Sequence, residues 1–307
     1  MKLTYADPKK EDWFLVSWTL SNKCNYRCSY CPSMLHDGSS GWPDKDVVFD
    51  FIKKFKLPNK EICYRMTGGE PTYWKHFLDF AKLVKSQGHY FSFITNGSQT
   101  VDYYKEISQY SDGIIISYHP DYADIQHIAA VANAVACPVA LNLMLVPELF
   151  SEQVSAAERL YALTDTLAIW PKVVLDKTSA DHITNEVSDY TEDQKAIIKS
   201  WPYFRKLDDS KLHRGDLLLD NNPINANQLI VNKLNNHRGW TCWAGLHMIK
   251  IDMFGNIFRS ECEQGGPIGT LTDYTLPSDT ITCAKDVCAC LSDIYLRKEI
   301  KILVERT

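Results

Sequence analysis

The feature that most constrains the fold is an alternation of short apolar runs with amphipathic segments, from residue 13 to about residue 176. The apolar runs are rich in β-branched and aromatic residues and stop at glycine, asparagine or proline, which is typical of buried strands. Between them, apolar residues recur at helical spacing opposite lysine and aspartate. The predicted strands are 13–20, 62–66, 90–95, 113–118, 139–145 and 167–175, and the predicted helices are 47–55, 77–84, 101–110, 123–136 and 151–163.

Six strand–helix repeats with short connections imply parallel strands joined by right-handed crossovers. The predicted fold class is therefore α/β, with a partial (β/α)6 barrel over residues 1–177 and ligands at the C-terminal ends of its strands. Residues 178–239 are polar and asparagine-rich, and we predict a linker with one helix, at 191–201. Residues 240–307 are predicted to form a small second domain with a β-hairpin, its turn marked by Gly255-Asn256.

Charge and hydropathy exclude several classes of partner. The chain has 307 residues and a formal net charge of −5, which gives no general attraction to nucleic acid or to an anionic membrane. No apolar run approaches the roughly 20 residues that cross a bilayer, and the N-terminus turns polar too early for a signal peptide. We therefore expect a cytoplasmic protein with neither a membrane nor a nucleic acid as its partner.

The ten cysteines are unevenly distributed, with three near the N-terminus and five between positions 242 and 290. In a chain without an export signal, such clusters indicate metal sites rather than disulfides. Cys24, Cys28 and Cys31 directly follow the first predicted strand, so they lie on the loop at its C-terminal end. Three thiolates can ligate three irons of a [4Fe–4S] cluster and leave the fourth iron open to a ligand. A zinc site, which normally takes four ligands, and a chance cluster are the alternatives.

The spacing of these cysteines resembles that of the radical S-adenosylmethionine (SAM) superfamily, whose hallmark is Cys-x3-Cys-x-aromatic-Cys, and Tyr30 stands at the aromatic position. The resemblance implies a [4Fe–4S] cluster whose open iron binds SAM. Gly68, Gly69 and Glu70, after the second strand, match the Gly-Gly-Glu that holds the methionyl amino group in this family. Two glycines also let the backbone approach a ligand closely, with amides free to pair with its polar groups.

Polar residues on the next strands complete the predicted cofactor site. The family tends to place contacts to ribose and carboxylate at the ends of the third and fourth strands, which favours Asn96 and Ser117, although a capping turn explains both equally simply. Asn142 lies within the apolar fifth strand and needs a buried partner, which is the cofactor, the substrate or another core residue. His119 is either a proton donor or acceptor near the substrate or an ordinary loop residue.

The second group of cysteines flanks the predicted hairpin. Four thiolates suit a structural zinc ion or a second iron–sulfur cluster equally well. The arrangement resembles the C-terminal auxiliary-cluster region of the twitch and SPASM subgroup, and five cysteines fit its short form with one auxiliary [4Fe–4S] cluster. We predict Cys242 and Cys262 as ligands, completed by two of Cys283, Cys288 and Cys290; the tight pair 288 and 290 is favoured, with Cys283 as the spare.

Together these features predict a radical SAM oxidoreductase or modifying enzyme. An electron from a reductant such as flavodoxin or ferredoxin would split SAM, and the 5′-deoxyadenosyl radical would take a hydrogen atom from the substrate. An auxiliary cluster bound by four thiolates would be closed and would then accept an electron, whereas a cluster with one open position could bind the substrate directly. The frequency of such substrates in the family favours a peptide or amino-acid-like substrate; a small-molecule alcohol, sugar or nucleoside is the alternative. A non-catalytic metal-binding protein is the alternative of another class.

Overall fold

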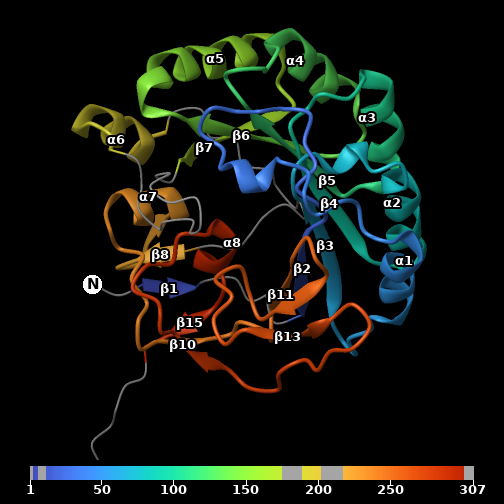
Figure 1. Cartoon of the computed structure of the whole chain (residues 1–307). Helices are drawn as coiled ribbons and strands as arrows, with labels where there is room; N and C mark the ends of the chain where they lie inside the picture. Colours follow the sequence, from blue (N-terminus) through green and yellow to red (C-terminus); the bar gives the residue numbers. More distant parts are fainter. Residues whose placement is uncertain (1–2, 6–11, 175–188, 202–216, 301–307) are drawn as a thin grey trace, which may run out of the picture.

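The computed structural model describes residues 3–5, 12–174, 189–201 and 217–300. Its centre is a curved sheet of nine strands in the order β13-β12-β11-β2-β3-β4-β5-β6-β7 (Figure 1). Six consecutive strands pair in parallel, as the strand–helix repeats predict. They are β2 (Trp13–Thr19), β3 (Glu61–Thr67), β4 (Tyr90–Thr95), β5 (Gly113–Tyr118), β6 (Val139–Leu145) and β7 (Leu167–Val173).

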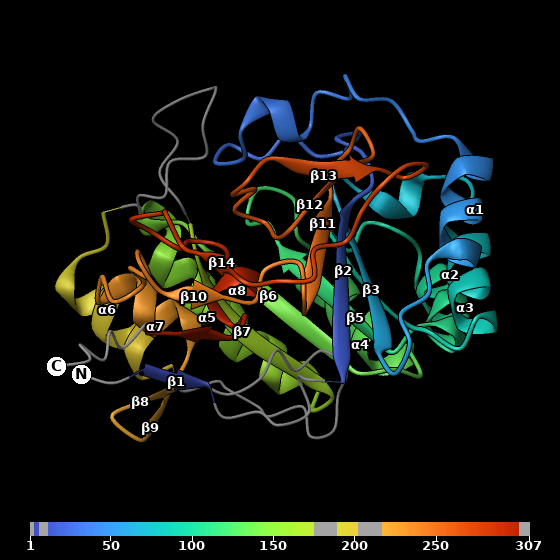
Figure 2. The same ribbon diagram turned by 90° about the horizontal axis from the view of Figure 1, so that it is seen from below.

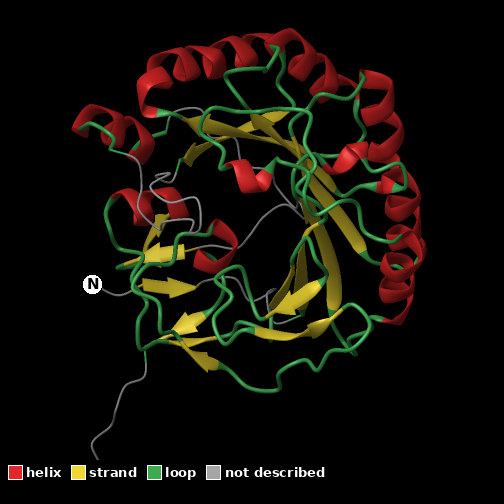
Figure 3. Ribbon diagram, in the orientation of Figure 1, coloured by secondary structure: helices red, strands yellow, loops and turns green. Residues whose placement is uncertain are grey.

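Five helices connect these strands and cover the convex face of the sheet (Figure 3). Several begin at a side-chain cap; Asp44, Thr100 and Asp124 each accept a hydrogen bond from a backbone N–H of the first turn. The helices are α1 (Lys45–Lys54), α2 (Phe77–Ser86), α3 (Val101–Ile107), α4 (Ile125–Ala134) and α5 (Phe150–Leu163). Short 3-10 helices lie at Ser33–Leu35, Pro71–Tyr73, Ser108–Tyr110 and Pro147–Leu149.

The two faces of the sheet carry alternate side chains of each strand, which separates the core from the interior of the barrel. On β2, Trp18 packs edge-to-face on Phe51 of α1, with ring centroids 5.5 Å apart, and on Phe80 of α2. On β3, Tyr64 likewise meets Phe80 edge-to-face. The residues next to these along each strand, such as Ser17 on β2 and Arg65 on β3, consequently face the concave side. The predicted α/β partial barrel is confirmed, and it is not closed: β13 and β7 are its edges among the described strands.

The C-terminal segment extends this sheet. The predicted hairpin forms between β11 (Met248–Ile251) and β12 (Asn256–Phe258), and Gly255 in its turn has a φ of 83°. β11 pairs in parallel with β2, and β13 (Pro267–Thr270) adds to β12, so the hairpin forms part of the barrel wall (Figure 2). The last short elements are β10 (Thr241–Cys242), β14 (Ile281–Thr282), α8 (Leu291–Ile294) and β15 (Lys298–Glu299).

The segment 178–239 holds more structure than the single helix expected there. The expected helix is α6 (Glu192–Lys199), but α7 (Ala226–Val231) follows, and β8 (Leu217–Leu219) and β9 (Asn222–Ile224) form a sheet with β1 (Leu3–Tyr5). The asparagines responsible for the polar composition act in turns and caps. Asn221 adopts a positive φ between the two strands, and Asn225 forms a capping box with Gln228. The predicted boundary at 177 lies outside the described residues.

No described helix is both long enough and apolar enough to cross a membrane.

Candidate active site

The first cysteine group lies on the loop that leaves β2 at the C-terminal edge of the parallel sheet, as predicted. Cys28 is buried, Cys24 and Cys31 are half-buried, and the Cys31 N–H donates to the Cys28 carbonyl oxygen at 3.1 Å. Within the described residues, no three His, Cys, Asp or Glu side chains form a group that could hold a metal ion. In a four-iron cluster each thiolate binds a different iron, so the cluster requires three thiols on one loop rather than three at one point.

Aromatic rings cover Cys28. Tyr30 stacks on His119, with ring centroids 5.9 Å apart, and its hydroxyl contacts His119 Nδ1. The same nitrogen lies 3.3 Å from the Cys28 sulfur. Burial lowers the pKa of His119 to about 4, so the imidazole is neutral near pH 7. Burial and the neighbouring cysteines raise the pKa of the Cys28 thiol to about 12 in the metal-free chain. His119 therefore contacts the cysteine loop through Tyr30 and Cys28, a position that the sequence analysis did not predict.

Gly68 and Gly69 let the loop after β3 lie directly against the cysteine loop. A Cβ on Gly68 would stand 2.4 Å from the Ser21 carbonyl oxygen, and one on Gly69 would stand 2.1 Å from that of Lys23. The Gly69 amide, which was expected to be free for a ligand, donates to the Ser21 carbonyl oxygen at 2.7 Å, and the Glu70 N–H donates to that of Lys23 at 2.7 Å. The expectation is therefore wrong for Gly69, because the two loops run side by side.

Glu70 is fully buried, and its carboxylate is held by donors from two loops. Oε1 accepts from the Thr72 N–H at 3.1 Å and from the hydroxyls of Thr72 and Thr95 at 2.7 and 2.8 Å. Oε2 accepts from the Asn96 N–H at 2.6 Å. Burial raises the pKa of Glu70, whereas these hydrogen bonds lower it. The carboxylate thus ties the end of β3 to the end of β4.

Asn96 links Glu70 to the cysteine loop through its side chain. Its side-chain amide donates to Asn25 Oδ1 at 2.8 Å and points to the Cys24 sulfur at 3.8 Å. The Cys24 sulfur also accepts from the Tyr26 N–H at 3.4 Å. Such donors stabilise a thiolate and tune a metal that it binds. The structure therefore brings Asn96 to the cysteine loop, and its predicted contact with SAM stays a prediction.

Ser117 and Asn142 lie side by side on β5 and β6, in register with each other and with Trp170 on β7. Both are buried, and neither side chain forms a hydrogen bond with another described residue. Both side chains belong to the concave face, because the residues that precede them, Ile116 and Leu141, pack in the helix-covered core. Their predicted contact with SAM stays a prediction.

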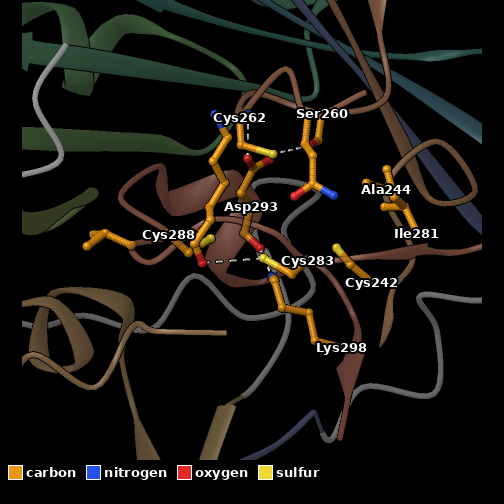
Figure 4. Close-up of a pocket in the computed structure, with 12 residues that line it drawn as sticks. Cys242, Ala244, Ser260, Cys262, Ile281, Cys283, Cys288, Asp293 and Lys298 are labelled. Carbon is orange, nitrogen blue, oxygen red and sulfur yellow. Dashed lines mark hydrogen bonds between the residues drawn. The ribbon is translucent and has the colours of Figure 1, made fainter. Parts of the chain in front are cut away.

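The second cysteine group surrounds a small cavity that is partly open to solvent. Figure 4 shows Cys242, Cys262, Cys283 and Cys288 around it. Cys290 is exposed and does not line the cavity, because the chain turns into α8 at this residue. The structure thus groups Cys283 with the other three and leaves out Cys290, which the sequence favoured.

Two buried charged residues, which the sequence analysis did not single out, line the same cavity. The Asp293 carboxylate accepts from the backbone N–H of Cys262 at 2.7 Å and of Glu261 at 3.1 Å, and burial raises its pKa to about 6. Lys298 is 3% exposed and donates to the Leu296 carbonyl at 3.0 Å and to that of Asp293. Four thiols beside a buried ammonium fit a negatively charged thiolate-bound cluster.

The concave face of the barrel carries a row of polar side chains that the sequence analysis also missed. The row consists of four neighbours in the strand register: Lys250 on β11, Ser17 on β2, Arg65 on β3 and Ser92 on β4. Glu261, beside Cys262, reaches into this row; Oε1 accepts from the Ser17 hydroxyl, and Oε2 lies 3.9 Å from Lys250 Nζ. The available signal was an arginine within the otherwise apolar segment 62–66.

Comparison with curated proteins links the chain to radical SAM enzymes over a short region. The S-adenosylmethionine-dependent nucleotide dehydratase of Fibrobacter sp. (strain UWH6) is 28% identical over 91 residues, 27% of each chain. The GTP 3′,8-cyclase of Haemophilus influenzae (strain 86-028NP) is 25% identical over 83 residues, 26% of this chain and 24% of that one. The chain spans about a quarter of the length of these relatives.

Solved structures share the fold over most of the chain. The structure described as native anSMEcpe with bound AdoMet and Kp18Cys peptide has a TM-score of 0.52 at 14% identity, covering 86% of this chain and 78% of that one. SuiB from Streptococcus suis has a TM-score of 0.51 at 12% identity, covering 82% and 61%. Residues 18–131, which include all three N-terminal cysteines and the Gly-Gly-Glu loop, match the family model of the Radical SAM superfamily. Residues 18–131 of this chain are thus a radical SAM domain.

Proposed function

We propose that this radical SAM enzyme cleaves SAM reductively and uses the 5′-deoxyadenosyl radical to take a hydrogen atom from a peptide or amino-acid-like substrate. The net reaction would be an oxidation or a modification such as a cross-link. The observation that carries the proposal is the position of three cysteines on one loop at the C-terminal edge of a curved parallel sheet. Ligands of such sheets bind at that edge.

Cys24, Cys28 and Cys31 are the proposed ligands of the first [4Fe–4S] cluster. When bound, this cluster supplies the electron that splits SAM. Asn96 holds the Cys24 sulfur through its amide, while Tyr30 and His119 cover Cys28 and exclude water from it. We further propose that Gly68, Gly69, Glu70, Ser117 and Asn142 form the SAM site; Glu70 would act by fixing the loops, since its oxygens already have donors within the chain.

Cys242, Cys262, Cys283 and Cys288 are the proposed ligands of an auxiliary [4Fe–4S] cluster of the twitch or SPASM type. Their position around one common cavity supports this choice. With four thiolates the site would be closed to substrate and would serve electron transfer. The substrate radical would lose a proton and pass one electron to this site, which balances a two-electron oxidation.

The substrate class rests on the comparisons. The described neighbour anSMEcpe holds a peptide in its structure, which supports a peptide substrate. The two curated relatives are named for reactions of nucleotides, which favours as second candidate a small molecule such as a nucleotide, sugar or alcohol. Deuterated substrates separate the two, because deuterium should move from the substrate carbon to 5′-deoxyadenosine only with the right class.

We also propose a cytoplasmic location and a flavodoxin or ferredoxin as the electron donor. All ten cysteines are free thiols, as expected in a reducing compartment. The electron donor follows from the chemistry, since cleavage of SAM consumes one electron.

A double variant tests the electron-acceptor role. Cys242→Ala with Cys262→Ala should still form 5′-deoxyadenosine from SAM and dithionite but should stop formation of the oxidised product. Full product yield from this variant would contradict the proposed role of the auxiliary cluster as electron acceptor. A non-catalytic metal-binding protein, the remaining alternative, would form no 5′-deoxyadenosine at all.

A further inference from the structure

Arg65 is an unpaired cation inside the barrel. Its side chain is 2% exposed, and Nε and Nη1 are enclosed by protein without any hydrogen-bond acceptor. No ion pair or hydrogen bond joins the Arg65 side chain to another described residue. Burying a guanidinium without a partner costs several kcal/mol, so a folded chain keeps one only when something else supplies the anion.

The carboxylate of Glu261, whose charge raises the pKa of Arg65 against the effect of burial, forms its contacts with other residues. Glu261 accepts from the Ser17 hydroxyl and faces Lys250, and Lys250 itself pairs with Glu263 at 2.6 Å. Ser92, the neighbour of Arg65 on β4, is fully buried, and its hydroxyl also has no partner. Two adjacent strands therefore present unpaired donors on the same face of the sheet.

The concave face becomes more exposed from this pair of donors toward the edge that carries the cysteines. Two residues further along each strand, on the same face, Thr67 and Ile94 are partly exposed. Gly113, opposite Ser92 on β5, has no side chain to fill the interior. A barrel interior is normally packed with bulky branched side chains. Around Arg65 the face is polar and has small residues, whereas Ile115 and Ala140 on the next strands form an apolar cluster.

We infer that Arg65, with Ser92 beside it, binds the anionic group of the substrate, a carboxylate or a phosphate. Guanidinium groups recognise both through charge-assisted hydrogen bonds. The inference rests on the proposed function, in which the substrate enters the barrel from the edge that carries Cys24, Cys28 and Cys31. It adds that the substrate carries a negative charge. Arg65 would hold this charge inside the barrel, with the reactive carbon of the substrate nearer the cysteine loop.

Anion binding tests the inference without radical chemistry. Isothermal titration calorimetry would use the reconstituted protein, without SAM or reductant, at constant ionic strength. Sodium pyrophosphate and disodium glutarate are the two probes, because one presents phosphate and the other carboxylate groups. Tighter binding of pyrophosphate would indicate a phosphorylated substrate, and tighter binding of glutarate a carboxylate such as an acidic side chain or a peptide C-terminus.

Arg65→Met should weaken the better probe at least tenfold, and Arg65→Lys should weaken it less because the charge remains. Arg159→Met, at an exposed arginine of α5, is the matched control and should bind like the wild type. Without a probe, Arg65→Met should unfold at the same or a higher temperature, since it removes an unpaired buried charge.

The inference is overturned if neither probe binds the wild type, or if Arg65→Met binds as tightly as the wild type. It is also overturned if Arg65→Met unfolds several degrees lower, which a purely structural arginine would cause. If Arg65→Met does not fold, the affinity of Arg65→Lys decides between the same outcomes. None of these results bears on SAM cleavage, which is measured separately.

Discussion

Glu70 Oε2 lies 2.6 Å from the backbone nitrogen of Asn96, and the Asn96 amide points in turn to the sulfur of Cys24. A buried carboxylate on the loop after β3 is thereby connected, through the end of β4, to the loop after β2. The three loops that would surround SAM are thus one hydrogen-bonded unit. A change at Glu70 should reach the cysteines although no atom of Glu70 contacts them.

Glu70→Gln tests this connection. A glutamine of the same shape brings an N–H₂ group among four donors, so at least one buried donor loses its acceptor. The expected loss is about 1–3 kcal/mol in the free energy of unfolding, measured by urea denaturation, with slower SAM cleavage. Glu106→Gln, at an exposed pair with Lys82, should change neither. Equal behaviour of the two variants would show that Glu70 does not hold the loops.

Gly69→Ala tests the close approach of two loops. The added methyl group would meet the Lys23 carbonyl at 2.1 Å and displace the cysteine loop, at about 1–3 kcal/mol. Gly88→Ala is the control, because it has open space but a φ of +76°, which costs about 1–2 kcal/mol without touching the site. After reconstitution, Gly69→Ala should lack the iron of the first site, while Gly88→Ala keeps it. Full iron content in both would contradict the predicted role.

Cys283→Ala and Cys290→Ala decide which cysteine completes the second site. Of these two cysteines, only Cys283 lines the cavity, so its removal should abolish the auxiliary cluster. The loss is measured as iron per chain and by electron paramagnetic resonance of the reduced protein. Cys290→Ala should retain both clusters. The reverse result would restore the preference for the Cys-x-Cys pair that the sequence suggested.

His237 should make stability depend on pH below neutrality. It is 1% exposed and packs edge-to-face on Trp240, and burial lowers its pKa to about 3. The unfolded chain takes up a proton near pH 6.5, whereas the folded chain does not. The contribution of neutral, buried His237 to the free energy of unfolding is therefore complete above pH 6.5. It declines as the pH falls from 6.5 toward 3, by up to about 1.4 kcal/mol per pH unit.

His237→Phe should flatten this decline when the free energy of unfolding is measured by urea denaturation between pH 7.5 and pH 5. His76→Phe, at a partly exposed ring, serves as the control. An unchanged slope in His237→Phe would show that the folded chain accepts the proton at this site.

The sequence predicted the barrel well because its signals are local. Each strand from β2 to β7 is a mostly apolar run, and each helix between them has one apolar face, so the order of these elements predicted the parallel sheet. The pairing of β11 with β2 was not predictable in this way. It joins residues more than two hundred positions apart, such as Lys250 and Ser17, and no local pattern encodes that partner.

The candidate site was predictable where spacing carried the information. The three N-terminal cysteines and the Gly-Gly-Glu loop lie together at the predicted edge. The second site was harder, since α8 begins at Cys290 and turns it from the cavity that Cys288 lines. Arg65 and Lys298 were missed because a single charged residue in a sequence does not reveal whether it is buried.

The most direct test of the account is the amount of 5′-deoxyadenosine formed from SAM and dithionite by the reconstituted protein. Chromatography should detect it with the wild type and with Cys290→Ala. Cys28→Ala, which removes one ligand of the first site, should give only the background without protein. Absence of 5′-deoxyadenosine from the wild type with its iron in place, or its undiminished formation by Cys28→Ala, would contradict the account.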